Sequence, residues 1–114
     1  MKQNAFPKRL RLGGNEEFKA VIANRRRFSD NVLVLYVAPN SREYSRLGVS
    51  VGRAAGNSVV RNRFKRLVRE VFRLNREQLP AGFDYVAIGS KTAKGLTFEN
   101  ATESLLKLAG RIKE

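Results

Sequence analysis

The chain has 114 residues, and its 23 Lys and Arg against 10 Asp and Glu give a formal net charge of +13. A chain of this length forms one domain with a core of its own, and the charge favours a nucleic acid over a neutral ligand as the partner. The sequence contains neither Cys nor His, which excludes disulfides, thiolate nucleophiles, Ser-His catalysis and the usual zinc sites.

The same charge would also suit a basic protein of the membrane surface. No apolar run approaches the roughly 18 residues of a membrane-spanning helix. Residues 1–6 lack the apolar segment of a signal peptide. We therefore expect a cytoplasmic protein that does not act at a membrane. Its few acids are scattered along the sequence, so we expect no carboxylate cluster of the kind that a two-metal nuclease needs.

The first half of the chain predicts one helix and three strands. The helix runs from Asn15 to about Asn24, because two glycines form a turn before it and two acids fall in its first turn, where the helix dipole favours them. A short strand is expected at 26–29. The β-branched run at 32–37 predicts a second strand, and 46–51 predicts a third.

The strand at 46–51 has one apolar face and one bare face, since Gly48 and Ser50 alternate with larger apolar residues. A bare face lets another surface approach closely. A further strand is expected at 83–88 and a last helix begins at Thr97, so a helix joins the strands at 46–51 and 83–88 and could place them in parallel. This order of elements indicates an α+β domain in which helices pack against a small sheet.

The connecting helix is the most informative part of the sequence. It runs from Ser58, a suitable N-cap, to about Glu77. At about 100° per residue, apolar residues such as Phe64 and Val68 fall on one arc, and polar residues fall opposite them. The polar residues are Asn62, Lys65, Arg66, Arg69, Arg73 and Arg76. Like charges at i,i+4 repel by roughly 0.2 to 0.5 kcal/mol, so a strip with Glu70 as its only acid indicates a polyanionic partner.

The segment 56–69 closely resembles the protein subunit of bacterial ribonuclease P. The match runs through the RNR signature Arg61-Asn62-Arg63 and the basic residues that follow it. Supporting similarity lies at 15–18, at 46–51 and at 83–86, so the resemblance covers nearly the whole chain in the right order.

The resemblance implies a single RNA-binding domain over residues 1–114. Its fold would be α+β, with a small four-stranded mixed sheet and three helices in the order αβββαβα. It would be like domain 2 of ribosomal protein S5, and a left-handed crossover, rare among parallel connections, would carry the RNR helix. The expected activity is endonucleolytic removal of the 5′ leader from precursor tRNA.

The resemblance also implies how this work is divided between protein and RNA. A large RNA subunit would hold the Mg²⁺ ions and perform the hydrolysis, so that this chain would supply no catalytic residue and bind no cofactor of its own. Its partners would be the ribonuclease P RNA and precursor tRNA, with no membrane and no obligate protein partner.

The resemblance assigns contacts with the RNA subunit to a set of mostly basic residues. These are Arg53, Arg61, Asn62, Arg63, Lys65, Arg66, Arg69 and Arg73. Alternatives stay open for several of them. Asn62 could hydrogen-bond a loop backbone, Arg63 could brace the sheet, and Arg73 could complement the helix dipole. Arg66 and Arg69 could belong to an ordinary solvated face.

The family's leader cleft lies between the first helix and the face of the sheet. The residues that the resemblance assigns to it are Phe18, Ile22, Tyr36, Ser50 and Gly52. Phe18 and Tyr36 match its aromatic positions, where stacking would tolerate a variable single-stranded leader; the alternative is that both rings belong to the core. Ile22 departs from the family, because relatives often have a second Phe there. Another departure is Gly52-Arg53-Ala54, where many relatives have two consecutive basic residues.

Other classes of protein share the charge and size of this chain. A ribosomal or other structural RNA-binding protein is the nearest alternative, followed by a DNA-packaging protein and a membrane-active cationic protein. The RNR segment between two strands argues against all three. An independent protein nuclease is a different class, which cleavage by the chain alone with Mg²⁺ would support.

Overall fold

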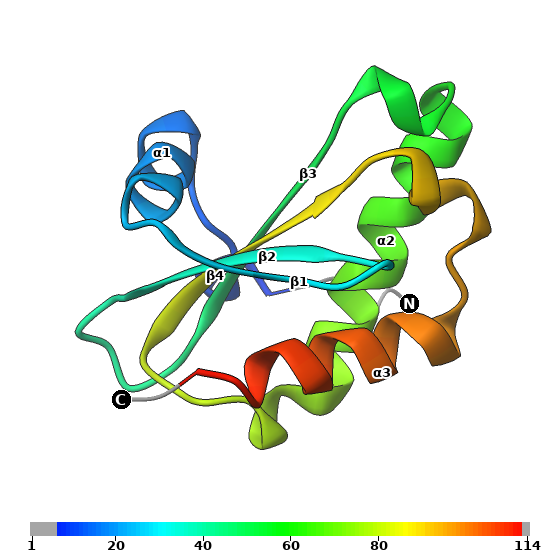
Figure 1. Cartoon of the computed structure of the whole chain (residues 1–114). Helices are drawn as coiled ribbons and strands as arrows, with labels where there is room; N and C mark the ends of the chain where they lie inside the picture. Colours follow the sequence, from blue (N-terminus) through cyan, green and yellow to red (C-terminus); the bar gives the residue numbers. More distant parts are fainter. Residues whose placement is uncertain (1–6, 113–114) are drawn as a thin grey trace.

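The computed structural model describes residues 7–112, which form a four-stranded sheet with three helices (Figure 1). The elements follow the order α1 (Asn15–Ala23), β1 (Arg26–Ser29), β2 (Val34–Pro39), β3 (Arg46–Val51), α2 (Ser58–Asn75), β4 (Phe83–Gly89) and α3 (Phe98–Ala109). Short 3₁₀ helices lie in several of the connections. This order confirms the predicted α+β fold and its αβββαβα arrangement.

The sheet has the strand order β1-β2-β4-β3, so β3 lies at one edge. β2 pairs antiparallel with β1 and with β4, whereas β3 and β4 are parallel and are joined through α2. The parallel pair expected from the sequence is therefore confirmed. The segment before α1 continues along the free edge of β3, where Arg11 bridges to Leu47 and the Leu12 N–H donates to the Leu47 carbonyl at 3.1 Å.

Different helices cover the two faces of the sheet (Figure 1). α2 and α3 cover one face, where Leu35, Leu47 and Phe64 belong to the main hydrophobic core. α1 covers part of the other face, where Val21 packs in a smaller cluster with partly buried Tyr36. Because side chains alternate along a strand, Gly48 and Ser50 of β3 also face the side of α1. Among the described residues, α1 is the one helix that packs on that side of the sheet.

The second strand begins at Val34, two residues later than the sequence predicts. The Asp30 carboxylate accepts hydrogen bonds from the backbone N–H groups of Val32 and Leu33, at 2.8 and 2.9 Å. These bonds hold the chain in a turn, as Asp side chains commonly do. The β-branched character of Val32 therefore does not bring it into the strand.

The basic helix begins and ends slightly differently from the prediction. Its N-cap is Asn57, not Ser58, since the Asn57 side chain accepts from the Val60 N–H at 3.1 Å. Asn and Ser are about equally good N-caps, so the predicted position was off by one residue. The α-helix ends at Asn75, and a 3₁₀ helix (Arg76–Gln78) follows it.

Candidate nucleic-acid interface

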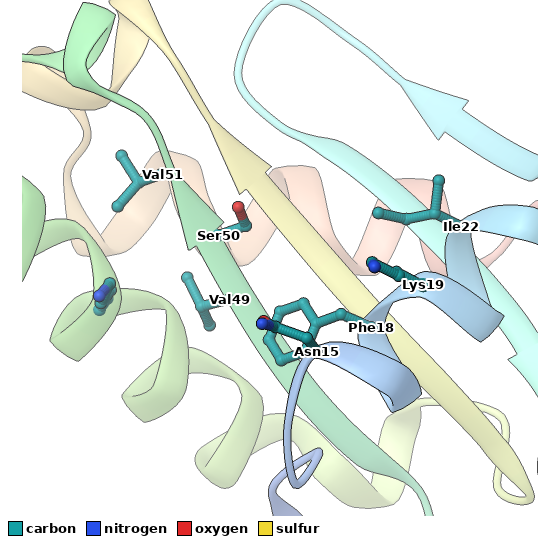
Figure 2. A pocket seen from close by; sticks show the side chains of 8 residues that line it. Asn15, Phe18, Lys19, Ile22, Val49, Ser50 and Val51 are labelled. Atoms are coloured by element: carbon teal, nitrogen blue, oxygen red, sulfur yellow. The ribbon is translucent and has the colours of Figure 1, made fainter.

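A groove of about 390 Å³ lies between α1 and the edge strand β3 (Figure 2). Its lining residues are Asn15, Phe18, Lys19, Ile22, Val49, Ser50, Val51 and Lys65. Phe18 and Ile22 lie one helical turn apart on α1, so both side chains project from the same side of that helix. Figure 2 shows the Phe18 ring reaching from α1 towards β3, with Ser50 further along the strand. The groove contains an aromatic ring, two lysines and no acid.

Gly48 lets the Phe18 ring lie against the sheet. A Cβ atom at Gly48 would lie 2.6 Å from Cζ of Phe18 and 2.9 Å from Cδ1 of Leu12. Real Cβ atoms do not approach other heavy atoms so closely, so only Gly at this position accommodates the ring. The bare strand face that the sequence predicts is thus partly filled by Phe18 and is open further along, at exposed Ser50.

The structure brings together three of the five residues that the resemblance assigns to the leader cleft: Phe18, Ile22 and Ser50 line the groove. Tyr36 faces the same side of the sheet and is partly buried in the cluster that contains Phe18, but it does not line the groove. Gly52 lies beyond the end of β3, outside the lining. Phe18 and Tyr36 are both only partly buried, so each ring combines packing with exposure.

Three further polar groove residues were not predicted: Asn15, Lys19 and Lys65. Asn15 lies three residues before Phe18 and four before Lys19, and Lys19 lies three before Ile22. These helical spacings are a signal that could have found both polar residues. Lys65 lies on α2, which follows β3 in the sequence, whereas α1 precedes β3. No local pattern brings it to this groove.

The predicted RNA-contacting residues of α2 differ in their surroundings. Arg61 Nε donates to the Gly56 carbonyl at 3.2 Å, so Arg61 makes the contact with a loop backbone that was one alternative for Asn62. Arg63 Nη2 donates to the Leu96 carbonyl at 2.7 Å and therefore braces the segment before α3 instead of the sheet. Asn62 is exposed.

Arg73 forms an ion pair within the helix. Its Nη2 lies 2.6 Å from Oε2 of Glu70, and the hydrogen bond to this carboxylate raises the pKa of Arg73. By contrast, Lys65, Arg66 and Arg69 form no ion pair with a carboxylate of residues 7–112. A polyanion can therefore pair with these three cations. Arg53 lies apart from them, exposed in the 3₁₀ helix Arg53–Ala55.

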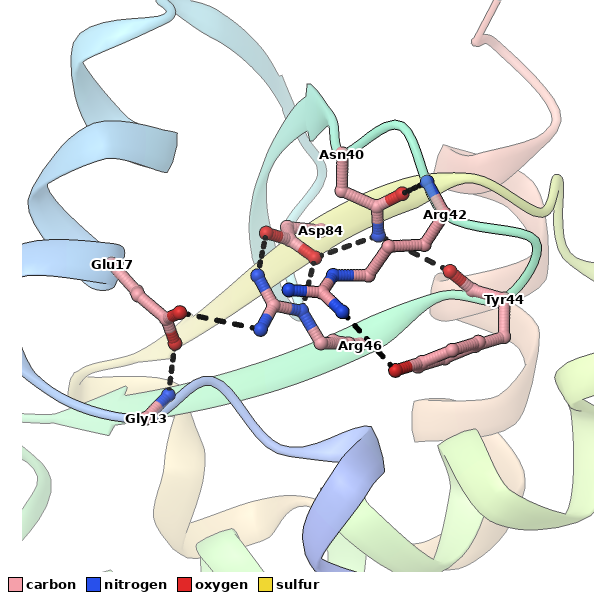
Figure 3. A network of polar contacts seen from close by, with 7 residues as sticks. All are labelled: Gly13, Glu17, Asn40, Arg42, Tyr44, Arg46 and Asp84. Atoms are coloured by element: carbon pink, nitrogen blue, oxygen red, sulfur yellow. Dashed lines mark hydrogen bonds and ion pairs between the residues drawn. The ribbon is translucent and has the colours of Figure 1, made fainter.

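A polar network holds the first turn of α1 to the sheet (Figure 3). Arg46 Nη2 lies 2.7 Å from Asp84 Oδ2, and Arg46 Nη1 lies 3.3 Å from Glu17 Oε2. Asn40 Nδ2 donates to Asp84 Oδ1 at 2.8 Å, and the Gly13 N–H donates to the Glu17 carboxylate. This last bond is the main reason why the pKa of Glu17 is lowered. Glu17 and Asp84 thus bind the same arginine, and the network fixes α1 beside the groove.

Residues 7–112 contain no group of three or more acids gathered as a metal site. Within the same range, no helix has the length and apolar character needed to cross a membrane.

An aromatic ring beside cations that line a groove is a combination found in proteins that bind single-stranded nucleic acid. Residues 6–113 match the family model described as Ribonuclease P. The ribonuclease P protein component of Clostridium kluyveri is 44% identical over 108 residues, covering 90% of this chain and 96% of that protein.

A second relative and a solved structure point to the same family. The ribonuclease P protein component of Petrotoga mobilis is 37% identical and covers 99% of both chains. The solved structure of the RNase P protein from Thermotoga maritima has a TM-score of 0.82 at 34% identity, covering 91% of this chain and 98% of that one. The chain belongs to the family of ribonuclease P protein components, subunits of an endoribonuclease that processes tRNA. This assignment confirms the resemblance and decides against the ribosomal alternative.

Proposed function

We propose that this chain binds the RNA subunit of ribonuclease P and the 5′ leader of precursor tRNA, and so promotes endonucleolytic removal of the leader. The observation that carries the proposal is that Phe18 and Lys19 line the same groove. Stacking on an aromatic ring and attraction of the backbone by cations are the two components of sequence-tolerant single-strand binding. The whole chain, residues 1–114, acts as one RNA-binding domain.

Phe18, Ile22 and Ser50 form the leader site, and Tyr36 supports it from β2, beneath α1. Ile22 is 39% exposed at the groove and offers an apolar surface without a ring. The basic strip of α2, together with Arg53 before that helix, contacts the RNA subunit. The residues of this strip are Arg53, Arg61, Asn62, Arg63, Lys65, Arg66, Arg69 and Arg73.

Hydrolysis is left to the RNA subunit, which holds the Mg²⁺ ions. Several of the chain's acids have structural roles: Glu17 and Asp84 bind Arg46, Glu70 binds Arg73, and Asp30 binds Lys107 at 3.3 Å. With no Cys or His in the sequence, a positioned general base is hard to supply. The protein instead offsets repulsion between the phosphates of enzyme and substrate with its net charge of +13. It does so in the cytoplasm, without an obligate protein partner.

One experiment tests this division of labour. Protein freed rigorously of RNA is incubated with precursor tRNA and Mg²⁺, alone and with ribonuclease P RNA, over a range of Mg²⁺ concentrations. We expect no cleavage by the protein alone, and we expect cleavage by the RNA to need less Mg²⁺ when the protein is present. Robust cleavage by RNA-free protein would make the chain a nuclease in its own right.

A further inference from the structure

The cations of α2 do not share one surface. Arg63 faces the segment before α3, because it donates to the Leu96 carbonyl. Lys65 lines the groove beside β3 and α1. Arg66 lies between these two directions and is exposed. A single helix therefore presents one flank to the groove and another to the outside of the molecule.

Arg69 belongs to the flank that faces β3. It follows Lys65 at i+4, about 6 Å further along the helix axis. It is half-buried, and burial together with the nearby Arg11 guanidinium lowers its pKa. Arg11 itself bridges to Leu47 along the free edge of β3. Lys65, Arg69 and Arg11 thus follow one another from the groove along the outer edge of this strand.

Two guanidinium groups that approach one another disfavour their own charges, since like charges raise the energy of the charged forms. An anion between or beside them removes that cost. Lys65 and Arg69 form no ion pair with a carboxylate in the described part of the chain, and the groove lining includes no acid. The edge of β3 is therefore suited to a chain of negative charges.

We propose that Lys65, Arg69 and Arg11 form a cation track that binds phosphates of the single-stranded leader, while Arg66 on the outer flank of α2 binds the RNA subunit. This inference rests on the proposed function, in which the groove receives the leader. In this inference Lys65 and Arg69 contact the leader of the substrate instead of the RNA subunit. Phe18 then stacks a base on one side of the groove, and the track holds the backbone on the other.

The size of the groove supports the assignment. About 390 Å³ is the scale of a site for one small ligand, which a nucleotide or two of a single strand can occupy. A folded RNA subunit meets the exposed flank of α2 more readily than it enters this space. Arg66 lies on that flank.

The test uses protein reconstituted with ribonuclease P RNA, under conditions in which cleavage is suppressed. The affinities for precursor tRNA and for mature tRNA, which lacks the leader, are measured over a range of salt concentrations, and their ratio isolates the leader. The affinity of the protein for the RNA subunit is measured separately. The variants are Lys65→Ala, Arg69→Gln and the matched control Arg66→Ala, one residue from Lys65.

We expect Lys65→Ala and Arg69→Gln each to make the dependence of the log affinity ratio on log salt shallower by about 0.7, the value for one phosphate contact with a single strand. The salt dependence of binding to the RNA subunit should stay unchanged for both. Arg66→Ala should make the salt dependence of binding to the RNA subunit shallower and should leave that of the affinity ratio unchanged. Lys65→Arg keeps the charge and should keep the parent slope. Thermal unfolding shows whether each variant is folded. If Arg69→Gln is not folded, Lys65→Ala still tests the inference.

Two outcomes would overturn the inference in different ways. If Lys65→Ala alters binding to the RNA subunit and leaves the ratio unchanged, while Phe18→Ala lowers the ratio, the cation track is wrong and the leader groove stands. If Phe18→Ala also leaves the ratio unchanged in a folded protein, the groove does not receive the leader and the proposed function of this site fails together with the track.

Discussion

The ring of Phe18 on α1 rests on the backbone of Gly48 in β3, at the point where the helix meets the bare face of the strand. A Cβ atom at Gly48 would lie 2.6 Å from Cζ of Phe18. The direction of the ring therefore depends on the absence of one methyl group in a different element. The position of Phe18 in the groove follows from this contact, and it can be changed without touching Phe18 itself.

Gly48→Ala should displace the Phe18 ring. The added methyl group also meets Cδ1 of Leu12, at 2.9 Å, so the site cannot relax on one side alone. Overpacking of this kind costs about 1 to 3 kcal/mol of the free energy of unfolding. We expect the ratio of precursor to mature tRNA affinity to fall as well, because the ring no longer lies where the leader passes.

Gly95→Ala is the matched control, since a Cβ there would meet no atom within 4 Å. It should change neither the unfolding free energy by more than a few tenths of a kcal/mol nor the affinity ratio. A Gly48→Ala variant with parent stability and parent ratio would show that the ring is not held by this contact.

Phe18→Ala should weaken the binding of precursor tRNA by about tenfold or more, because stacking of a base on an aromatic ring is worth roughly 1 to 3 kcal/mol. Tyr36→Ala should have a smaller effect, since Tyr36 packs with Phe18 from β2 and does not line the groove. Both effects should be absent for mature tRNA. The measurement is the affinity ratio in the reconstituted enzyme.

Phe98→Ala provides the control for the loss of a ring. Phe98 is 38% exposed at the start of α3, on the other side of the sheet from α1. Its removal should leave the ratio at the parent value. If Phe18→Ala and Tyr36→Ala stay folded and the ratio also holds for them, both rings serve packing alone.

Elements whose signals are local were predicted well from the sequence. β1 and β3 have the predicted bounds. α3 begins at Phe98, directly after the N-cap Thr97, and has a capping box in which the Thr97 and Asn100 side chains each bind the other's backbone N–H. Turn residues, period-two alternation and helix caps all act within a few residues. The fold class follows from such signals, whereas the assignment of Phe18 and Ile22 to a groove came from the family resemblance.

Features that depend on distant residues were not predicted. Arg46 joins Glu17 and Asp84 from positions 29 and 38 residues away, so no short pattern indicates the network. Lys65 reaches the groove only because α2 packs beside the edge strand β3. The angular position of a residue on a helix does not say which neighbour its flank will meet, and the basic strip therefore looked uniform in the sequence.

Gly89→Ala should destabilise the protein without acting at the groove. A Cβ at Gly89, the last residue of β4, would collide with the ring of Phe64, which is fully buried under the other face of the sheet. We expect a loss of about 1 to 3 kcal/mol in the free energy of unfolding, measured by denaturant titration. Gly52→Ala, whose Cβ would meet nothing within 4 Å, should unfold like the parent. Equal stability of the two variants would contradict this view of the core.

Asp30 should make stability depend on pH, because its carboxylate ties the turn before β2 to α3. Partial burial acts to raise the pKa of Asp30, but the backbone N–H groups of Leu33 and Val32 and the side chains of Ser104 and Lys107 lower it below its ordinary value of 3.8.

A carboxyl whose pKa is lowered on folding stabilises the folded state at pH values above the unfolded pKa, and this stabilisation is lost as the pH falls through the folded pKa. The unfolding temperature of the parent should therefore exceed that of Asp30→Asn at neutral pH, and the difference should shrink below about pH 3.8. Glu103→Gln, an exposed change on α3, is the control for the loss of one carboxylate and should unfold like the parent at neutral pH. A constant difference between the parent and Asp30→Asn from neutral to acid pH would mean that the Asp30 charge does not stabilise the fold.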